Sequence, residues 1–185
     1  MNQIQFVSSL RDFFHYGDEE HLKTSYDLIR EAAKCPPQTT GINWENEEFI
    51  FNRLFVGPAA PKAPVIASAY IDPDEKVQGK ITRDVREFYN SIGLSLHEEG
   101  NMPEDSLPFE LDACLYLLKL AEQVPDITTI YQEFIDQHLA LWLPKFTYTA
   151  SLCCEDSVAV RDVIELMETW IINEATDLLL TKELS

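Results

Sequence analysis

The sequence predicts an all-α protein, a single-domain helical bundle that comprises residues 1–185. Apolar residues recur at steps of three and four through most of the chain, which is the period of a helix with one buried face. Apolar and polar residues do not alternate over a useful length, as they would in a half-buried strand. Hydrophobic residues make up 45% of the chain, enough for a core, and neither a repeat nor a Gly/Ser linker divides it.

Proline and glycine delimit the predicted elements of the first half. Helical spacing predicts a helix over residues 26–33, stopped by Cys35-Pro36-Pro37, and another over residues 44–55, ended by Gly57-Pro58. Residues 57–79 contain four prolines before Gly79. Because each proline removes an amide donor and restricts the residue before it, this segment is expected to be an extended loop with one short strand or turn.

The helices of the second half are predicted from caps and apolar stripes. Thr82 is the expected N-cap of a helix that Gly93 ends, and residues 94–107 form an acidic connection. A strongly apolar helix is expected over residues 108–121, followed by Pro125 as a terminator. Asp126 is the expected cap of the next helix, which Pro144 kinks or ends, so residues 146–152 continue at a changed angle. The last helix is predicted over residues 158–180.

The charge balance excludes two classes of ligand. The chain contains 14 Lys and Arg residues and 32 Asp and Glu residues, a formal charge of −18. A nucleic-acid surface neutralises phosphates with clustered Lys and Arg, so nucleic-acid binding is not expected, and anionic membranes are disfavoured for the same reason. No stretch approaches the roughly 20 apolar residues that span a bilayer, and the N-terminus does not resemble a signal peptide. We therefore expect a cytoplasmic protein without membrane insertion.

No strong catalytic or metal-binding motif is present. The four histidines are scattered, and no H-E-x-x-H, C-x-x-C or Gly-rich phosphate loop occurs. No metal, cofactor or catalytic residue is therefore expected, and the four cysteines are expected to be reduced thiols. His138 is expected to be a core histidine with its hydrogen bonds satisfied. An acidic cluster, for which a solvated loop is favoured over a Mg²⁺ site, comprises Glu98, Glu99, Glu104 and Asp105.

Several short motifs follow one another between about residues 48 and 146. They are Phe51-Asn52-Arg53-Leu54-Phe55-Val56-Gly57-Pro58, Val85-Arg86-Glu87-Phe88-Tyr89, Met102-Pro103-Glu104-Asp105-Ser106-Leu107, Phe134-Ile135-Asp136-Gln137-His138-Leu139 and Trp142-Leu143-Pro144-Lys145-Phe146. In order and spacing they resemble the TorD/DmsD family of cytoplasmic chaperones for molybdoenzymes. Ser106 stands where this family usually has histidine, so guanine-nucleotide binding is not carried over.

The resemblance implies a chaperone that binds the twin-arginine signal peptide and the apo form of a molybdopterin-containing oxidoreductase. Such a protein holds the enzyme until its cofactor is inserted and then releases it for export. The family includes monomers and domain-swapped dimers, and the client enzyme is left open. One alternative is a NarJ-like assembly factor for a non-exported or membrane-anchored enzyme. The alternative from another class is a Mg²⁺-dependent all-α hydrolase that uses the acidic cluster.

A twin-arginine leader has a basic region followed by an apolar stretch, so its site needs carboxylates beside an apolar surface. Glu104 and Asp105, with Ser106, are the candidates for the basic part. The candidates for the apolar part are Leu54, Phe55, Tyr70, Phe88, Trp142 and Phe146, although a helical stripe buries such residues in the core by default. Glu104→Lys or Asp105→Lys is expected to weaken peptide binding without unfolding the chain.

Overall fold

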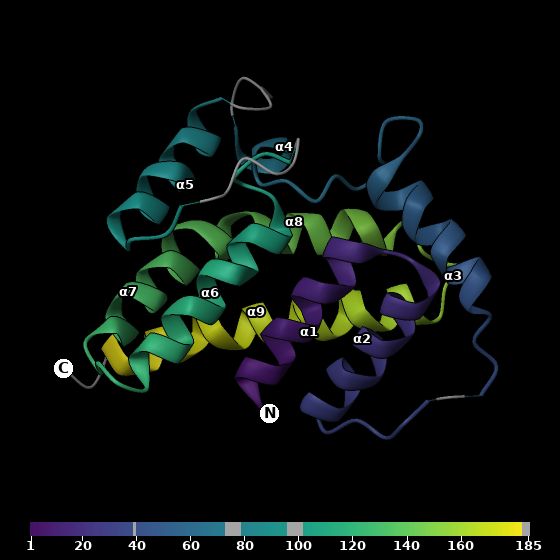
Figure 1. Ribbon diagram of the computed structural model, residues 1–185, viewed down its shortest axis with the longest axis horizontal. Helices are drawn as coiled ribbons and strands as arrows, with labels where there is room; N and C mark the ends of the chain where they lie inside the picture. Colours follow the sequence, from purple (N-terminus) through teal and green to yellow (C-terminus); the bar gives the residue numbers. More distant parts are fainter. Residues whose placement is uncertain (39, 73–78, 96–101, 183–185) are drawn as a thin grey trace.

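The computed structural model describes residues 1–38, 40–72, 79–95 and 102–182, which form helices and one isolated antiparallel bridge between Ile66 and Ser106 (Figure 1). The prediction of an all-α fold is confirmed. The elements are α1 (Gln3–Tyr16), α2 (Glu19–Ala32), α3 (Trp44–Phe51), the π-helical turn η1 (Asn52–Val56), α4 (Ser68–Ile71), α5 (Lys80–Ser91), α6 (Leu107–Ala121), α7 (Ile127–Phe134), the π-helical turn η2 (Ile135–Leu139), α8 (Ala140–Ser151) and α9 (Ala159–Lys182).

The helices pack around one cluster of buried apolar side chains. α1 packs against α2 and α6, α6 packs against α7, and α8 runs beside α9. Figure 1 shows α3 and α5 at opposite ends of this arrangement. The largest fully buried side chains come from helices far apart in the sequence and include Phe6, Phe13, Tyr26, Phe51, Trp142, Phe146 and Trp170. None of the helices in the described part of the chain is long and apolar enough to cross a bilayer.

The first two helices begin at side-chain caps. The predicted elements did not include α1, which starts where the Asn2 side chain accepts a hydrogen bond from the Gln5 amide and ends at Gly17 in the left-handed region. A Cβ at Gly17 would lie 2.3 Å from the ring of Phe51, so two helices approach closely there. α2 starts at Glu19 rather than at residue 26, because Asp18 caps it through the His21 amide.

The N-terminus of α5 differs from the prediction. The helix is preceded by Gly79, and Thr82 lies inside it. The Thr82 hydroxyl does not cap α5, because it is fully buried and donates to the Asp105 carboxylate at 2.8 Å. Gly93, with φ of 77°, follows the helix as predicted.

α7, η2 and α8 form one continuous helical segment. Pro144 neither ends nor interrupts it, since α8 continues through this residue to Ser151. The irregularity lies one turn earlier, where the Ala140 amide donates to the Ile135 carbonyl and closes a π turn. A π turn also follows α3: in η1 the Gly57 amide donates to the Asn52 carbonyl, and η1 ends at Gly57 as predicted.

A buried carboxylate fixes the start of α9. Glu47 of α3 is only 3% exposed. It accepts hydrogen bonds from the Ser157 hydroxyl, from the Val158 amide at 3.0 Å and from the Val160 amide at 3.4 Å. These donors lie at the start of α9, where amides have no partner within the helix and where the helix dipole favours a negative charge. The contact therefore joins the two halves of the chain.

Candidate functional site

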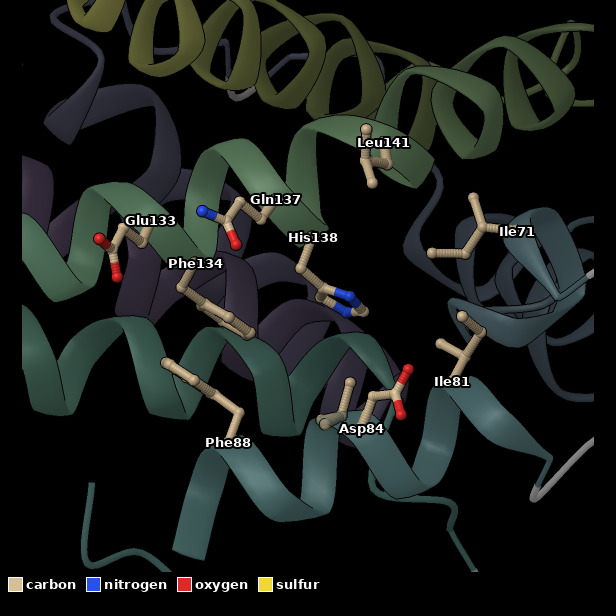
Figure 2. Close-up of a pocket in the computed structure, with 10 residues that line it drawn as sticks. Ile71, Ile81, Asp84, Phe88, Glu133, Phe134, Gln137, His138 and Leu141 are labelled. Carbon is tan, nitrogen blue, oxygen red and sulfur yellow. The ribbon is translucent and has the colours of Figure 1, made fainter. Parts of the chain in front are cut away.

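A cavity of about 300 Å³ lies between α5 and the α7–η2–α8 segment (Figure 2). We call it the α5 groove and define it by its lining residues Ile71, Ile81, Asp84, Val85, Phe88, Glu133, Phe134, Gln137, His138 and Leu141. Figure 2 shows Phe88, Phe134 and Glu133 at one end, His138 and Asp84 in the middle, and Ile71, Ile81 and Leu141 at the other end. The groove therefore has an aromatic end, a polar middle and an aliphatic end.

Two helical stripes produce this lining. On α5, Ile81, Val85 and Phe88 are spaced by four and three residues and therefore share one face. On the opposite wall, Phe134 and His138 share a face in the same way. Phe88 stacks on Phe134 with ring centroids 4.4 Å apart and an interplanar angle of 5°. Phe134 stacks in turn on His138, with centroids 5.4 Å apart. A column of three rings thus connects α5 to η2.

A buried carboxylate lies behind His138. Glu110 of α6 is fully buried, and its two oxygens accept hydrogen bonds from His138 Nε2 at 2.6 Å and from Trp142 Nε1 at 2.9 Å. His138 was predicted to be a core histidine with satisfied hydrogen bonds, and its side chain is only 14% exposed. It also lines the groove, so it connects the buried Glu110 to the solvent-accessible cavity.

Burial and mutual attraction shift both members of this pair. Burial raises the pKa of Glu110, and the nearby His138 opposes this rise without cancelling it. Burial alone would lower the pKa of His138, but the Glu110 carboxylate outweighs it, so the pKa of His138 is raised. Both groups therefore hold protons more tightly in the folded protein than in the unfolded chain.

This pair predicts a pH dependence of stability. Because both folded-state pKa values exceed the unfolded ones, the pair's contribution is largest at acid pH and falls as pH rises through the raised pKa of each group. Urea unfolding between about pH 6 and pH 9 should show the wild type losing more stability than Glu110→Gln, which lacks the carboxylate hydrogen-bonded to His138. Parallel pH profiles for the two proteins would contradict this coupling.

Two carboxylates flank the apolar lining of the groove. Asp84 pairs with Lys80 one turn away at 2.5 Å, and both side chains are at least half exposed. Glu133 is exposed and makes no ion pair with a described residue. The described residues that line the groove include neither lysine nor arginine, and His138 is the sole titratable base among them. The groove thus combines an apolar floor with negative edges.

Asp105, a predicted ligand contact, holds one wall of the groove in place. The residue is fully buried, and its two oxygens accept from the Ser68 amide of α4 and the Thr82 hydroxyl of α5, each at 2.8 Å. Both carboxylate oxygens are thus occupied within the protein, and the predicted contact with a ligand stays a prediction. Asp105→Lys would bury a cation in this site, so the structure predicts a destabilised variant where the sequence alone led us to expect a folded one.

Glu104 and Ser106 also attach α4 and α5 to the start of α6. The Glu104 carboxylate pairs with Arg86 of α5 at 2.5 Å, and its carbonyl accepts from the Tyr89 hydroxyl at 3.0 Å. Ser106 is fully buried and pairs by its backbone with Ile66. The Met102–Ser106 motif thus holds α5 in place through Glu104 and Asp105. Glu104, part-exposed, remains a predicted ligand contact.

The structure separates the predicted apolar candidates into two groups. Leu54, Phe55, Trp142 and Phe146 are core residues, each at most 4% exposed. Tyr70 is half-buried against Trp142, with ring centroids 5.8 Å apart. Phe88 lies in the groove. Four of the six apolar candidates are therefore buried in the core, as expected for residues on a helical stripe.

Sequence reasoning did not assemble the groove. Asp84, Glu133 and Leu141 belong to no motif, and their common signal is weak, namely two facing stripes at helical spacing. The proposed Mg²⁺ cluster is not assembled from its described members, since Glu104 pairs with Arg86 and Asp105 is buried. Glu98 and Glu99 lie outside the described residues.

The structure is thus an all-α fold with an acid-flanked apolar groove. Within the described part of the chain, no group of three or more His, Cys, Asp or Glu side chains could hold a metal ion. A family model described as the nitrate reductase delta subunit matches residues 18–148. The chain belongs to this family, and the resemblance to TorD-type proteins is confirmed.

Curated relatives carry chaperone names. A "Chaperone protein TorD" of Psychrobacter sp. is 33% identical over 100 residues, which cover 52% of this chain and 45% of the relative. A TorD of Vibrio cholerae is 31% identical over 102 residues, covering 52% and 46%. A "Perchlorate reductase assembly chaperone protein" of Dechloromonas aromatica is 27% identical over 127 residues, covering 62% and 57%. The chain thus spans about half the length of the curated TorD relatives it matches.

A solved structure shares the fold. It is described as a redox enzyme maturation protein from Archaeoglobus fulgidus, with a TM-score of 0.56 and 19% identity over 96% of this chain and 93% of that one. At this identity the similarity concerns the fold alone.

Proposed function

We propose that this protein is a cytoplasmic maturation chaperone that binds the twin-arginine leader peptide and the apo form of a molybdopterin-containing oxidoreductase. Family membership supports the general role, because TorD relatives and an assembly chaperone of perchlorate reductase carry such names. The observation that carries the leader-binding part is the α5 groove, where an apolar floor lies between two carboxylates.

The chemistry of the groove fits a leader peptide. A twin-arginine leader presents cations next to an apolar stretch, and carboxylates bind guanidinium groups with charge-assisted hydrogen bonds. The formal charge of −18 on the chain adds long-range attraction for a basic segment, which speeds encounter more than it tightens binding. Aliphatic residues at one end of the groove suit an apolar side chain of the same peptide.

A second candidate function follows from the family description. The delta-subunit model and the perchlorate reductase relative favour an assembly factor for a reductase, which is the NarJ-like alternative. This candidate shares the molybdoenzyme client but does not need a twin-arginine leader. The two functions therefore differ in the segment of the client that is bound.

A pull-down with this protein as bait tests the proposal. From the host cytoplasm, we expect a molybdoenzyme precursor with its leader still attached, released by an excess of the synthetic leader peptide. If the precursor is recovered but an excess of the leader peptide does not release it, the assembly-factor candidate is favoured. Recovery of no molybdoenzyme would contradict both candidates.

Salt provides an independent measurement. Calorimetric titration of the leader peptide should show affinity falling between about 0.1 M and about 1 M NaCl, because the Debye length shrinks from about 10 Å to about 3 Å. An affinity that does not change with salt would contradict the role assigned to the carboxylates.

A further inference from the structure

A second pocket lies where α3 continues into η1. We call it the Arg53 pocket; it has a volume of about 290 Å³, and its lining residues are Phe49, Asn52, Arg53, Gly57, Pro58 and Ala59. We propose that it binds an acidic segment of a partner protein, in which a carboxylate pairs with Arg53 and a neighbouring apolar side chain packs on Phe49. Figure 1 shows α3 and α5 at opposite ends of the fold, so this site is separate from the α5 groove.

The Arg53 guanidinium is partly buried without an acid beside it. Its Nε atom is covered by the protein and has no hydrogen-bond acceptor among the described residues, and the side chain forms no ion pair with any of them. Removal of a charge from water costs free energy, which a bound carboxylate offsets. Because the effective dielectric constant beside a partly buried group is lower than in water, this pairing is stronger than one between fully solvated side chains. Arg53 therefore favours an anionic ligand.

The chain around Arg53 contains no acidic residue that competes for it. Residues 49–71 contain Arg53 and Lys62 but neither Asp nor Glu, in a chain that has 32 acidic residues. Glu48, the acid closest to Arg53 in sequence, accepts a hydrogen bond from the Glu19 amide at 2.9 Å and does not line the pocket. Among the described residues that line the pocket, Arg53 is the single charged one. The pocket is therefore locally positive on a chain of net charge −18, and charge complementarity selects an acidic partner.

The rest of the pocket is mainly apolar and shaped by a tight turn. Phe49 precedes Arg53 by one helical turn and is 65% exposed, so a large ring lies in water beside the guanidinium. Gly57 has a φ of 114°, and a Cβ at this position would lie 2.6 Å from the Ala59 carbonyl oxygen, so this turn requires glycine. An apolar side chain next to the carboxylate would remove the Phe49 ring from water, whereas a small free anion would not.

Two synthetic peptides with blocked termini test the charge. The first contains one aspartate followed by a leucine and no other charge, and the second has asparagine in place of the aspartate. In calorimetric titrations the wild type should bind the aspartate peptide about tenfold more tightly, and Arg53→Gln should bind both peptides equally. Arg83→Gln, which removes the same charge from an exposed position of α5, should keep the wild-type preference. Equal affinity of the wild type for the two peptides would overturn the pairing.

The Nε–H group of Arg53 provides a readout that belongs to this residue alone. The Nε atom is shielded from solvent, and its NMR signal is identified as the one that Arg53→Gln removes. The aspartate peptide should shift this signal, and the asparagine peptide should leave it in place. If the aspartate peptide binds but the signal does not move, the contact lies elsewhere and the proposal is wrong.

Two exposed aromatic residues test the apolar part. Phe49→Ala should weaken binding of the aspartate peptide several-fold, because the leucine of the peptide loses the ring on which it packs. Tyr148→Ala is the matched control and should bind like the wild type, since Tyr148 is 64% exposed, belongs to α8 and does not line the pocket. Unchanged urea midpoints will show that the variants are folded. Acetate that binds as tightly as the aspartate peptide would reveal an anion site without an apolar part and contradict the proposal.

This inference goes beyond the proposed function and does not rest on it. If the protein distinguishes the two peptides through Arg53 but the pull-down yields no molybdoenzyme, the Arg53 pocket stands and the proposed function fails. If the precursor is recovered but Arg53→Gln binds the aspartate peptide like the wild type, the Arg53 pocket is overturned and the proposed function stands.

Discussion

Glu110→Ala is expected to lower the free energy of unfolding by about 3–5 kcal/mol, the loss found when one member of a buried ion pair is removed. The variant leaves His138 Nε2 and the buried indole N–H of Trp142 without their shared acceptor, the fully buried Glu110 carboxylate. Urea unfolding followed by circular dichroism at neutral pH measures the change.

The control separates the hydrogen bonds from the charge. Glu110→Gln keeps the length of the side chain and one acceptor oxygen, so it should lose less stability than Glu110→Ala. Glu168→Ala, an exposed change of the same kind on α9, should stay within about 0.5 kcal/mol of the wild type. A Glu110→Ala protein as stable as the Glu168→Ala protein would show that the buried pair does not stabilise the fold.

Asp105→Ala is the change with the next largest expected effect, a loss of about 3 kcal/mol. Each buried donor left without an acceptor costs about 1–3 kcal/mol, and this variant leaves two, the Ser68 amide and the Thr82 hydroxyl. Because these donors belong to α4 and α5, peptide binding in the α5 groove should weaken too, although Asp105 itself is fully buried. Both effects are measured on one preparation, by urea unfolding and by peptide titration.

Asp105→Asn is the matched control. The amide can accept from the Ser68 N–H through its oxygen and donate to the Thr82 hydroxyl, so both contacts are kept without a charge. We expect most of the stability and most of the peptide affinity to return. If Asp105→Asn instead loses affinity while remaining fully stable, the negative charge of Asp105 acts on the ligand and the positioning role is wrong.

The sequence predicts the helices better than it predicts the site. Helical spacing locates α5, α6 and α9 closely, because one buried face with a glycine or proline stop is a local property. Burial of a charged residue is not local. Asp105 lies in a polar, acidic segment and is predicted to be exposed, yet Ser68 and Thr82 draw it inward through contacts across 37 and 23 residues of chain.

The α5 groove could not be predicted from the sequence for a related reason. From the sequence, Leu141 and His138 are parts of one apolar helical stripe. Nothing in this stripe indicates that α5 packs opposite to it. The sequence also does not indicate the π turn between α7 and α8. Pro144, which was expected to bend the helix, lies after this turn, inside α8. Only the tertiary arrangement distinguishes groove residues from core residues.

The η2 turn also determines where this chain can change length. A turn closed by an i to i+5 hydrogen bond contains one residue more than an α turn, so deletion of one residue within residues 135–139 leaves an ordinary helix. Because both kinds of turn complete one revolution, the residues after the deletion keep facing the same side. Trp142 and Phe146 then stay in the core. A relative that lacks one residue here can therefore keep the same core with a regular helix, whereas a deletion elsewhere in α8 would rotate the residues after it.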